Sequence, residues 1–317
     1  MPDAAATVSA SDRVMGTRAE VILVGGSRTL ADAALDRLHE LERRWSRFLP
    51  DSEISRCNRS GGAPCIVSDD TAALVERLLL ASDMSDGHFD PTQLGRLQAL
   101  GYDRSWPGLD GRGSAEIAAA TAAPGATDIR VDRERRMVWL PTGTQIDPGG
   151  LGKGFAADLV TGELRDTGVA GALVSVGGDL RVFGQPPSGG AWRVGIDDPQ
   201  SPGRTIAEVH LTTGGLATSS VLRRRWTLTD GTEAHHLIDP TTGRPAERRS
   251  LAATAVSTSA WRAEAATKVA LIAGVSAERA LDDLEVRALV VVDRDGATSV
   301  VRDERHEVHV APVAVMA

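Results

Sequence analysis

The sequence predicts an α+β fold in which helices pack on mixed or antiparallel sheets. Strand and helix patterns are interspersed without the strict alternation of a doubly wound fold, and short strand patterns follow one another over residues 192–229. No internal repeat is present. The chain has 317 residues, 42% of them hydrophobic, so it can bury a large core in one domain or in two interleaved subdomains.

The N-terminal part of the chain predicts one strand and two long helices. Residues 17–24 alternate as a strand does, and residues 30–45 place leucines at helical spacing. Residues 46–64 are rich in Ser, Arg, Asn and Gly, which predicts a long loop. A second amphipathic helix is expected over residues 69–84, with Ser68 as its N-cap.

The rest of the chain predicts many short strands separated by a few helices. Strand patterns occupy residues 129–131, 137–140, 172–176, 192–196, 206–211, 216–218, 225–229, 252–257 and 288–292. Helix patterns run from the glycine-rich segment near residue 150 to about residue 166, over 260–273 and over 277–284.

These elements predict one domain over residues 15–302, or two interleaved subdomains within it. A disordered N-terminal segment (1–14) and a C-terminal tail (303–317) are expected to flank it. Residues from about 104 to 128 are rich in Gly, Ala and Pro, which predicts a flexible insertion.

Charge and composition exclude some classes of protein. The formal charge is -8 and the longest basic run is Arg223–Arg225, which argues against a nucleic-acid-binding surface. No apolar run is long enough to span a membrane, and the first residues lack the pattern of a secretory signal. We therefore expect a cytoplasmic protein, although a chain trimmed of its export signal would look the same. Cys57 and Cys65 give neither a disulfide framework nor zinc-ligand spacing.

The segment from Asp147 to Gly162, DPGGLGKGFAADLVTG, delivers Lys153 onto the start of an apolar-patterned helix. Glycines let backbone N–H groups approach a phosphate, a helix N-terminus adds partial positive charge, and a lysine adds a full charge. Gly154 follows the lysine, so the segment is not a Walker loop, which requires Ser or Thr there. A phosphate site and a helix-starting turn with an exposed lysine are the two interpretations of the segment alone.

Further polar clusters lie at turns between apolar elements, where binding and catalytic residues tend to occur. They are Met15-Gly16-Thr17, Phe48 with Ser52-Glu53, His88-Phe89-Asp90, Gly177-Gly178-Asp179, Ala217-Thr218-Ser219 and the segment from His235 to Pro240. Taken singly, each has a structural explanation. Asp90 and Asp239 precede prolines and are typical of Asx turns, and a lone histidine such as His236 is more often packed than catalytic.

The linear order of these clusters changes their interpretation. MGT, S-R-F-x-x-x-S-E-I-S-R-x-N, G-H-F-D-P-T, D-x-G-G-x-x-K-G, V-G-G-D, A-T-S and H-x-I-D-P-T-T-G follow one another along the chain. This series resembles the FAD:protein FMN transferases of the ApbE type, from about Met15 to Gly274. The resemblance implies an ApbE-like, T-fold-related architecture. It also implies a reaction that moves FMN from FAD to a Thr or Ser hydroxyl of an acceptor flavoprotein and releases AMP.

The resemblance assigns roles to single residues. By match to the family motifs, FAD would contact Met15, Phe48, His88, Phe89, Asp90, Lys153 and Ile238. Phe48 stands where a tyrosine is common. His236 would lie beside the pyrophosphate and take the proton of the acceptor hydroxyl, with Lys153 and Asp239 as further catalytic residues. These roles agree with the chemistry, because breaking a phosphoanhydride requires charge neutralisation and a histidine suits an attacking hydroxyl.

The resemblance further implies a divalent metal, usually magnesium, and here the sequence departs from the family pattern. The family uses the backbone carbonyl three residues before the lysine, here Gly150, with an Asp and, four residues later, a Thr. Glu264 replaces the Asp, and Lys268 occupies the Thr position. Three interpretations stay open: Thr267 is the substitute ligand, Lys268 replaces part of the metal's charge, or the metal is lost and the protein only binds flavin.

The sequence therefore leaves two kinds of function open. Lys153, His236 and Asp239 favour an FMN transferase whose partner is an acceptor flavoprotein, with no nucleic acid and no membrane span involved. The departures at Glu264 and Lys268 favour an FAD-binding protein without transferase activity, or an FAD pyrophosphatase.

Overall fold

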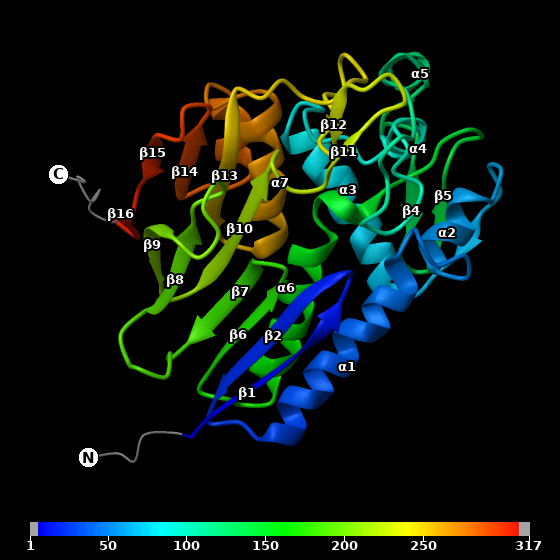
Figure 1. The fold of residues 1–317 in the computed structure, drawn as a ribbon. Coiled ribbons are helices and arrows are strands. Elements are labelled where there is room, and N and C mark those ends of the chain that lie inside the picture. The colour runs from blue at the N-terminus through cyan, green and yellow to red at the C-terminus, as the bar shows by residue number, and fades with distance from the viewer. Residues whose placement is uncertain (1–5, 311–317) are drawn as a thin grey trace.

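The computed structural model describes residues 6–310 and confirms the predicted α+β class. An eight-stranded sheet crosses the molecule, and its neighbouring strands all pair antiparallel. In spatial order its strands are β1 (Thr7–Val14), β2 (Thr17–Val24), β6 (Gly171–Val176), β7 (Asp179–Gly184), β10 (Gly214–Ser220), β13 (Ser250–Ser257), β14 (Ala288–Asp293) and β15 (Thr298–Asp303). One face of this sheet is covered by α1 (Arg28–Trp45), α6 (Gly152–Asp166) and α7 (Ala260–Ile272) (Figure 1).

Smaller sheets and short helices complete the described part of the chain. One small sheet has the spatial order β3 (Cys65–Ile66), β5 (Met137–Trp139), β4 (Arg130–Asp132). A second has the order β16 (Val308–Val310), β9 (Thr205–Leu211), β8 (Trp192–Asp197). The third pairs β11 (Arg225–Thr227) with β12 (Glu233–His235). The helices are α2 (Glu53–Asn58), α3 (Asp69–Met84), α4 (Leu94–Ala99), α5 (Ala115–Ala120), α8 (Glu278–Asp283) and the 3₁₀ turn η1 (Pro148–Gly150). Among residues 6–310, no helix combines the length and the apolar composition that a membrane crossing needs.

Most predicted elements are confirmed to within a few residues. The predicted strand over 17–24 is β2, whose buried side chains alternate with more exposed ones. The predicted helix over 69–84 is α3, and the Ser68 hydroxyl caps it by accepting a hydrogen bond from the backbone N–H of Thr71. The strands predicted over 129–131 and 137–140 are β4 and β5, which pair antiparallel as a hairpin. The other predicted strands and helices appear as α1, α6, β6, β8, β9, β10, β11, β13, α7, α8 and β14.

Two segments that were expected to lack regular structure contain helices. The loop expected over residues 46–64 contains α2, whose N-cap Ser52 accepts a hydrogen bond from the N–H of Ser55. A helix of this length is too short to show a clear helical period in the sequence. The insertion expected at about 104–128 contains α5 and the buried Leu109, and its flexibility stays a prediction.

The expectations for the two ends of the chain are wrong where the structure describes them. Residues 7–14, expected in a disordered segment, form β1 and pair with β2 along their whole length. Residues 308–310, expected in a tail, form β16 and pair with β9. Both are edge strands with few buried side chains, so neither shows the alternation that reveals a strand in sequence. The remainder of these two predictions, over 1–5 and 311–317, lies outside the described residues.

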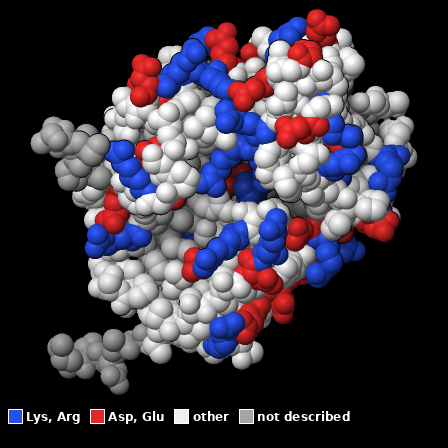
Figure 2. Space-filling view, viewed as in Figure 1, with Lys and Arg blue, Asp and Glu red and all other residues white. Residues whose placement is uncertain are grey.

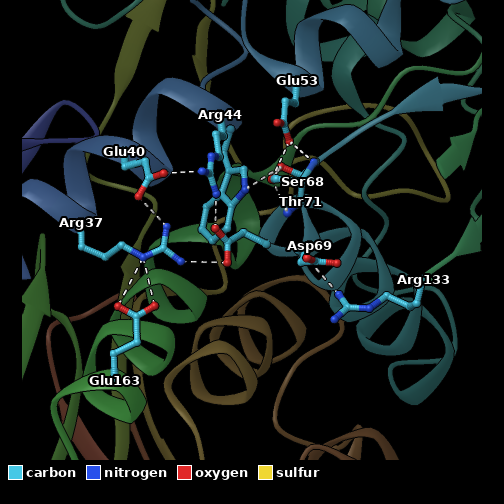
Figure 3. A network of polar contacts seen from close by, with 11 residues as sticks. Arg37, Glu40, Arg44, Glu53, Ser68, Asp69, Thr71, Arg133 and Glu163 are labelled. Carbon is cyan, nitrogen blue, oxygen red and sulfur yellow. Dashed lines mark hydrogen bonds and ion pairs between the residues drawn. The ribbon is translucent and has the colours of Figure 1, made fainter. Parts of the chain in front are cut away.

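A polar network holds α1 against α3 and α6 (Figure 3). The guanidinium of Arg37 lies 2.8 Å from the carboxylate of Asp70, on α3, and 3.0 Å from that of Glu163, on α6. Arg44, about two turns further along α1, pairs with the same Asp70 and with Glu40. The network fixes the C-terminal half of α1. The residues that follow this helix, Ser46 to Phe48, line the candidate site.

Helices α6 and α7 approach each other closely at Gly154. A Cβ at this position would lie 2.6 Å from the carbonyl carbon of Ala260, so no side chain fits without a shift of the backbone. The close approach lets Glu264 of α7 accept a hydrogen bond of 2.8 Å from the Gly154 N–H. Asp158 of α6 in turn accepts hydrogen bonds from the N–H groups of Ala260 and Trp261. Each helix therefore supplies a carboxylate that accepts hydrogen bonds from N–H groups in the first turn of the other helix.

Replacing Gly154 with alanine is expected to lower the free energy of unfolding by about 1–3 kcal/mol, because the added methyl group overpacks the contact between α6 and α7. The matched control is Gly162→Ala in the same helix, where an added Cβ meets nothing within 4 Å. This control should stabilise the protein by about 0.5–1 kcal/mol, because alanine restricts the unfolded chain more than glycine does. Urea unfolding measures both values, and equal effects at the two positions would show that the close contact is not formed.

Candidate functional site

A cavity of about 500 Å³ opens between the end of α1, the turn after α3, the start of α6, the segment after β12 and helix α7. Its size is typical of small-molecule sites. Figure 2 shows Lys and Arg side chains gathered around a hollow near the middle of the face drawn in Figure 1. All the residues expected to contact FAD line the cavity, namely Met15, Phe48, His88, Phe89, Asp90, Lys153 and Ile238. Gly150, His236 and Lys268 line it as well.

Met15 reaches the cavity from the tip of the hairpin formed by β1 and β2. The two-residue turn Met15-Gly16 has positive φ at both positions, 53° and 70°, as a type I′ turn requires. Glycine adopts this conformation freely, whereas methionine adopts it at a cost in free energy. Strain of this kind tends to be retained where it serves function, so the conformation of Met15 favours a contact with a ligand.

Two aromatic side chains, Phe48 and Tyr102, form one wall of the cavity, and Trp226 packs against Tyr102. The ring centroids of Phe48 and Tyr102 lie 5.8 Å apart, and those of Tyr102 and Trp226 lie 5.6 Å apart. The guanidinium of Arg47 lies 4.2 Å from the centroid of Phe48 and forms an ion pair of 3.1 Å with Asp147. Phe48 and Tyr102 face the cavity, and such a wall suits a flat aromatic ring.

Sequence reasoning missed three of these cavity residues. Arg47 and Asp147 stand inside two of the recognised motifs, but their ion pair joins positions far apart in sequence, which no local pattern reveals. Tyr102 lies in a segment with weak periodicity, and its only signal is that it is the single tyrosine of the chain.

The turn after α3 contributes His88, Phe89 and Asp90. Oδ1 of Asp90 accepts hydrogen bonds from the backbone N–H and the hydroxyl of Thr92, at 2.8 and 2.7 Å, which is the Asx turn that a position before proline predicts. The ring of Phe89 packs against Gly150, where an added Cβ would lie 2.5 Å from Cε2 of the ring. The packing of Phe89 therefore explains the glycine at position 150 without any role for its carbonyl group.

Two lysines and two carboxylates form a buried cluster beside the cavity. Nζ of Lys153 lies 2.7 Å from Oδ2 of Asp179 and donates a hydrogen bond to Oε1 of Glu264. Lys268, about one turn along α7 from Glu264, donates to the same oxygen at 3.3 Å. Both lysines line the cavity, whereas neither carboxylate does. The cluster is balanced in charge, and its two lysines are the members that border the cavity.

The cluster holds its central ion pair in the charged form. Burial would raise the pKa of Glu264, but Lys153 and Lys268 hold that pKa below its usual range. Burial would lower the pKa of Lys153, but Asp179 and Glu264 raise it above its usual value. Burial lowers the pKa of Lys268, and the attraction of Glu264 offsets only part of this effect.

The surroundings of Thr267 argue against the expectation that it is the substitute metal ligand. Its hydroxyl donates a hydrogen bond of 2.7 Å to the carbonyl of Glu264 and shares another of 2.7 Å with the hydroxyl of Ser219. Thr267 is fully buried and is not among the residues that line the cavity. One residue along a helix is a rotation of about 100°, which turns Thr267 away from the face that carries Lys268.

The remaining expected ligands do not fit a divalent metal either. Oε1 of Glu264 accepts hydrogen bonds from Lys153 and Lys268, and Oε2 accepts one from the N–H of Gly154. A cation bound to this carboxylate together with the carbonyl of Gly150 would lie beside an ammonium group, which repels it. No cluster of three or more His, Cys, Asp and Glu side chains suited to a metal occurs among residues 6–310.

His236 lies on the segment after β12 and lines the cavity. Burial, together with the nearby charge of Arg224, lowers the pKa of His236 well below 6.5, so the imidazole is neutral at pH 7. Its Nδ1 atom is buried and makes no hydrogen bond to any residue that the structure describes. A buried ring nitrogen without a partner costs free energy, which favours a ligand group as its natural partner.

Asp239 is not brought into the cavity, although its neighbours Ile238 and Pro240 line it. Oδ1 of Asp239 accepts hydrogen bonds of 2.8 and 2.6 Å from the backbone N–H and the hydroxyl of Thr241. This is again the Asx turn that a position before proline predicts. We therefore expect Asp239 to position the segment that carries His236 rather than to touch a substrate.

His235, next to the candidate base, gives a prediction about stability. The side chain is buried, its Nε2 lies 3.1 Å from the carbonyl oxygen of Ala246, and its Nδ1 accepts a hydrogen bond from the N–H of Leu237. Burial lowers the pKa of His235 to about 4. Between about pH 4 and 6.5 the unfolded chain therefore binds more protons at this residue than the folded chain does, so stability falls as the pH falls through this range.

The expected loss at this residue is about 3 kcal/mol over that pH range. In the variant His235→Gln, the slope of the free energy of unfolding against pH should be smaller between about pH 4 and 6.5. The decrease should correspond to at most one fewer proton bound on unfolding. Urea unfolding at a series of pH values measures the slope. A variant with the wild-type slope would show that His235 is not held neutral by burial.

The chain is similar to proteins of one family. The model of the ApbE family matches residues 15–290. The chain is 26% identical over 282 residues to the FAD:protein FMN transferase of Vibrio cholerae, covering 86% of this chain and 82% of that relative. It is 31% identical over 259 residues to the FAD:protein FMN transferase of Salmonella typhimurium, covering 79% of this chain and 73% of that relative. The solved structure of the ApbE protein from Thermotoga maritima matches with a TM-score of 0.81 at 26% identity, covering 94% of this chain and 97% of that one.

Proposed function

The chain belongs to the ApbE family, and we propose that it is an FAD:protein FMN transferase, which moves FMN from FAD to a Thr or Ser hydroxyl of an acceptor flavoprotein and releases AMP. The observation that carries the proposal is the convergence of an aromatic wall, two lysine ammonium groups and a neutral histidine on one cavity. These three features suit the rings of FAD, its pyrophosphate and the acceptor hydroxyl, respectively.

In the proposed complex, the pyrophosphate of FAD lies against Lys153 and Lys268. Lys268 is buried and Lys153 is partly buried, so their ammonium groups stabilise negative charge more strongly than they would in water. Phe48 and Tyr102 pack against a ring of FAD. Met15, at the turn between β1 and β2, makes a further apolar contact with FAD. FAD is thus held by contacts from segments that only the folded chain brings together.

In the proposed reaction, the oxygen of the acceptor hydroxyl attacks the phosphorus atom of the FMN half. A new P–O bond forms between this oxygen and the FMN phosphorus, and the bond from that phosphorus to the bridging oxygen breaks. AMP leaves with the bridging oxygen and its electron pair, while the hydroxyl proton passes to the neutral imidazole of His236. Positioning and charge neutralisation are the main sources of rate enhancement in such a transfer.

The departure from the family pattern at Glu264 and Lys268 favours a second candidate, an FAD-binding protein without transferase activity. In that case the cavity binds FAD but the pyrophosphate bond stays intact. Hydrolysis of FAD to FMN and AMP is a third possible outcome, in which water takes the place of the acceptor hydroxyl at the same site.

One assay separates these outcomes. The protein is incubated with FAD and an acceptor flavoprotein domain, and with the same domain in which the acceptor Thr is replaced by Val. A transferase gives flavin fluorescence on the denatured acceptor, no fluorescence on the Val control, and free AMP. Bound FAD without AMP would support the binding protein, and AMP with FMN but no labelled acceptor would support hydrolysis.

A further inference from the structure

We propose that Lys268 is a catalytic residue whose ammonium group supplies the positive charge at the pyrophosphate, so that this chain transfers FMN without a divalent cation. The inference rests on the proposed transferase function. It starts from the mismatch between the expected metal ligands and the groups that the structure places around Glu264.

The place for a cation beside Glu264 is already taken. Both oxygens of this fully buried carboxylate already accept hydrogen bonds, from Lys153, Lys268 and the N–H of Gly154. Magnesium requires nearly octahedral oxygen coordination at short distance and binds poorly next to an ammonium group. Part of the positive charge that a metal would bring is present already in the Lys268 ammonium group of α7.

The Lys268 ammonium group has N–H donors left for hydrogen bonds to a ligand. An ammonium group has three N–H donors. Among the described residues, the Lys268 ammonium makes one side-chain hydrogen bond, to Glu264, and the Lys153 ammonium makes two ion-pair contacts, to Asp179 and Glu264. The donors left over belong to two lysines that both line the cavity. A purely structural ion pair on a helix would face solvent or protein, whereas this one borders the cavity that the expected FAD-contacting residues line.

The charges of the two lysines and the two carboxylates balance before the reaction, and the reaction changes this balance. Lys153 and Lys268 are neutralised by Asp179 and Glu264 before FAD enters, so the empty site carries no net charge from these four groups. When the pyrophosphate bond breaks, the bridging oxygen gains negative charge and leaves with AMP. The Lys268 ammonium group can donate a hydrogen bond to this oxygen as its negative charge develops, because a single hydrogen bond to Glu264 holds the Lys268 side chain. Lys153, in contrast, is held by two carboxylates. No metal enters the step, and no other reactant is needed.

The test compares the wild-type protein with the double variant Glu264→Asp, Lys268→Thr, which restores the family residues at both positions. FMN transfer to the acceptor domain and AMP release are measured in EDTA and in excess MgCl₂. The wild-type rate is expected to be the same in the two conditions within about twofold. The double variant is expected to lose about 100-fold or more in EDTA and to recover with MgCl₂, because removal of one charge-stabilising group typically costs 10²–10³-fold.

Two further measurements keep the inference falsifiable if the double variant folds poorly. Lys268→Met should lose activity in both conditions, whereas Lys268→Arg should keep part of it in EDTA. Titration with Mn²⁺, followed by electron paramagnetic resonance on the FAD-loaded proteins, should show a saturable protein site in the double variant and none in the wild type.

The outcomes separate the inference from the function on which it rests. Wild-type transfer that EDTA abolishes and MgCl₂ restores would overturn the role of Lys268 and leave the transferase function standing. Binding of FAD without transfer or AMP release in any condition would overturn the transferase function and the inference together.

Discussion

Lys153→Met is expected to reduce FMN transfer by about 10³-fold and to weaken FAD binding, since it removes an ammonium group at the proposed pyrophosphate site. The same change leaves Asp179 and Glu264 with Lys268 as the only cation of the cluster. Removing one partner of a buried ion pair typically costs about 3–5 kcal/mol. Urea unfolding and FAD titration by flavin fluorescence measure the two effects.

The matched control is the double variant Lys153→Met, Asp179→Asn, which separates catalysis from stability. Asn at position 179 keeps an oxygen that accepts a hydrogen bond from the N–H of Thr218, and it leaves Glu264 paired with Lys268. The double variant should recover most of the lost stability, because the buried charges balance again, but it should not recover transfer. Recovery of activity together with stability would mean that Lys153 has only a structural role.

His236→Gln is expected to slow the transfer step by about 10²–10⁴-fold, the usual contribution of a general base. FAD binding should change little, since the proposed role of His236 concerns the acceptor proton. Single-turnover transfer rates and the Kd for FAD separate these two quantities. Because the pKa of His236 is lowered well below 6.5, the wild-type rate should stay level as the pH falls from about 8 to about 6.5.

The control for this prediction is Asp239→Asn, three residues along the same segment. Asn preserves the oxygen that accepts hydrogen bonds from Thr241, so the turn should persist. The transfer rate should therefore fall much less than in His236→Gln. A loss as large as that of the His236 variant would return Asp239 to the catalytic role that the resemblance implied.

The sequence predicts the fold class and most of the elements because their patterns are local. The helix over 69–84 begins at a serine cap and the hairpin after residue 129 has two apolar strands, and both appear where the patterns place them. The seven residues expected to contact FAD, from Met15 to Ile238, also meet at one cavity, as a common ligand requires.

The features that the sequence does not reveal depend on contacts between distant residues. The edge strands β1 and β16 gain their structure by pairing with neighbours, not from their own alternation. The direction of Thr267 depends on which face of α7 packs against Ser219 of β10, and spacing along the helix left this open. The saturation of Glu264 by Lys153, Lys268 and the N–H of Gly154 requires the close approach of α6 and α7.

The central claim is that this cavity transfers the FMN half of FAD to a protein hydroxyl. Intact mass spectrometry of the acceptor domain, with AMP quantified in the same reaction, tests it most directly. We expect the acceptor to gain the mass of FMN less one water, with one AMP released for each acceptor modified. An acceptor of unchanged mass beside protein that has bound FAD would contradict FMN transfer.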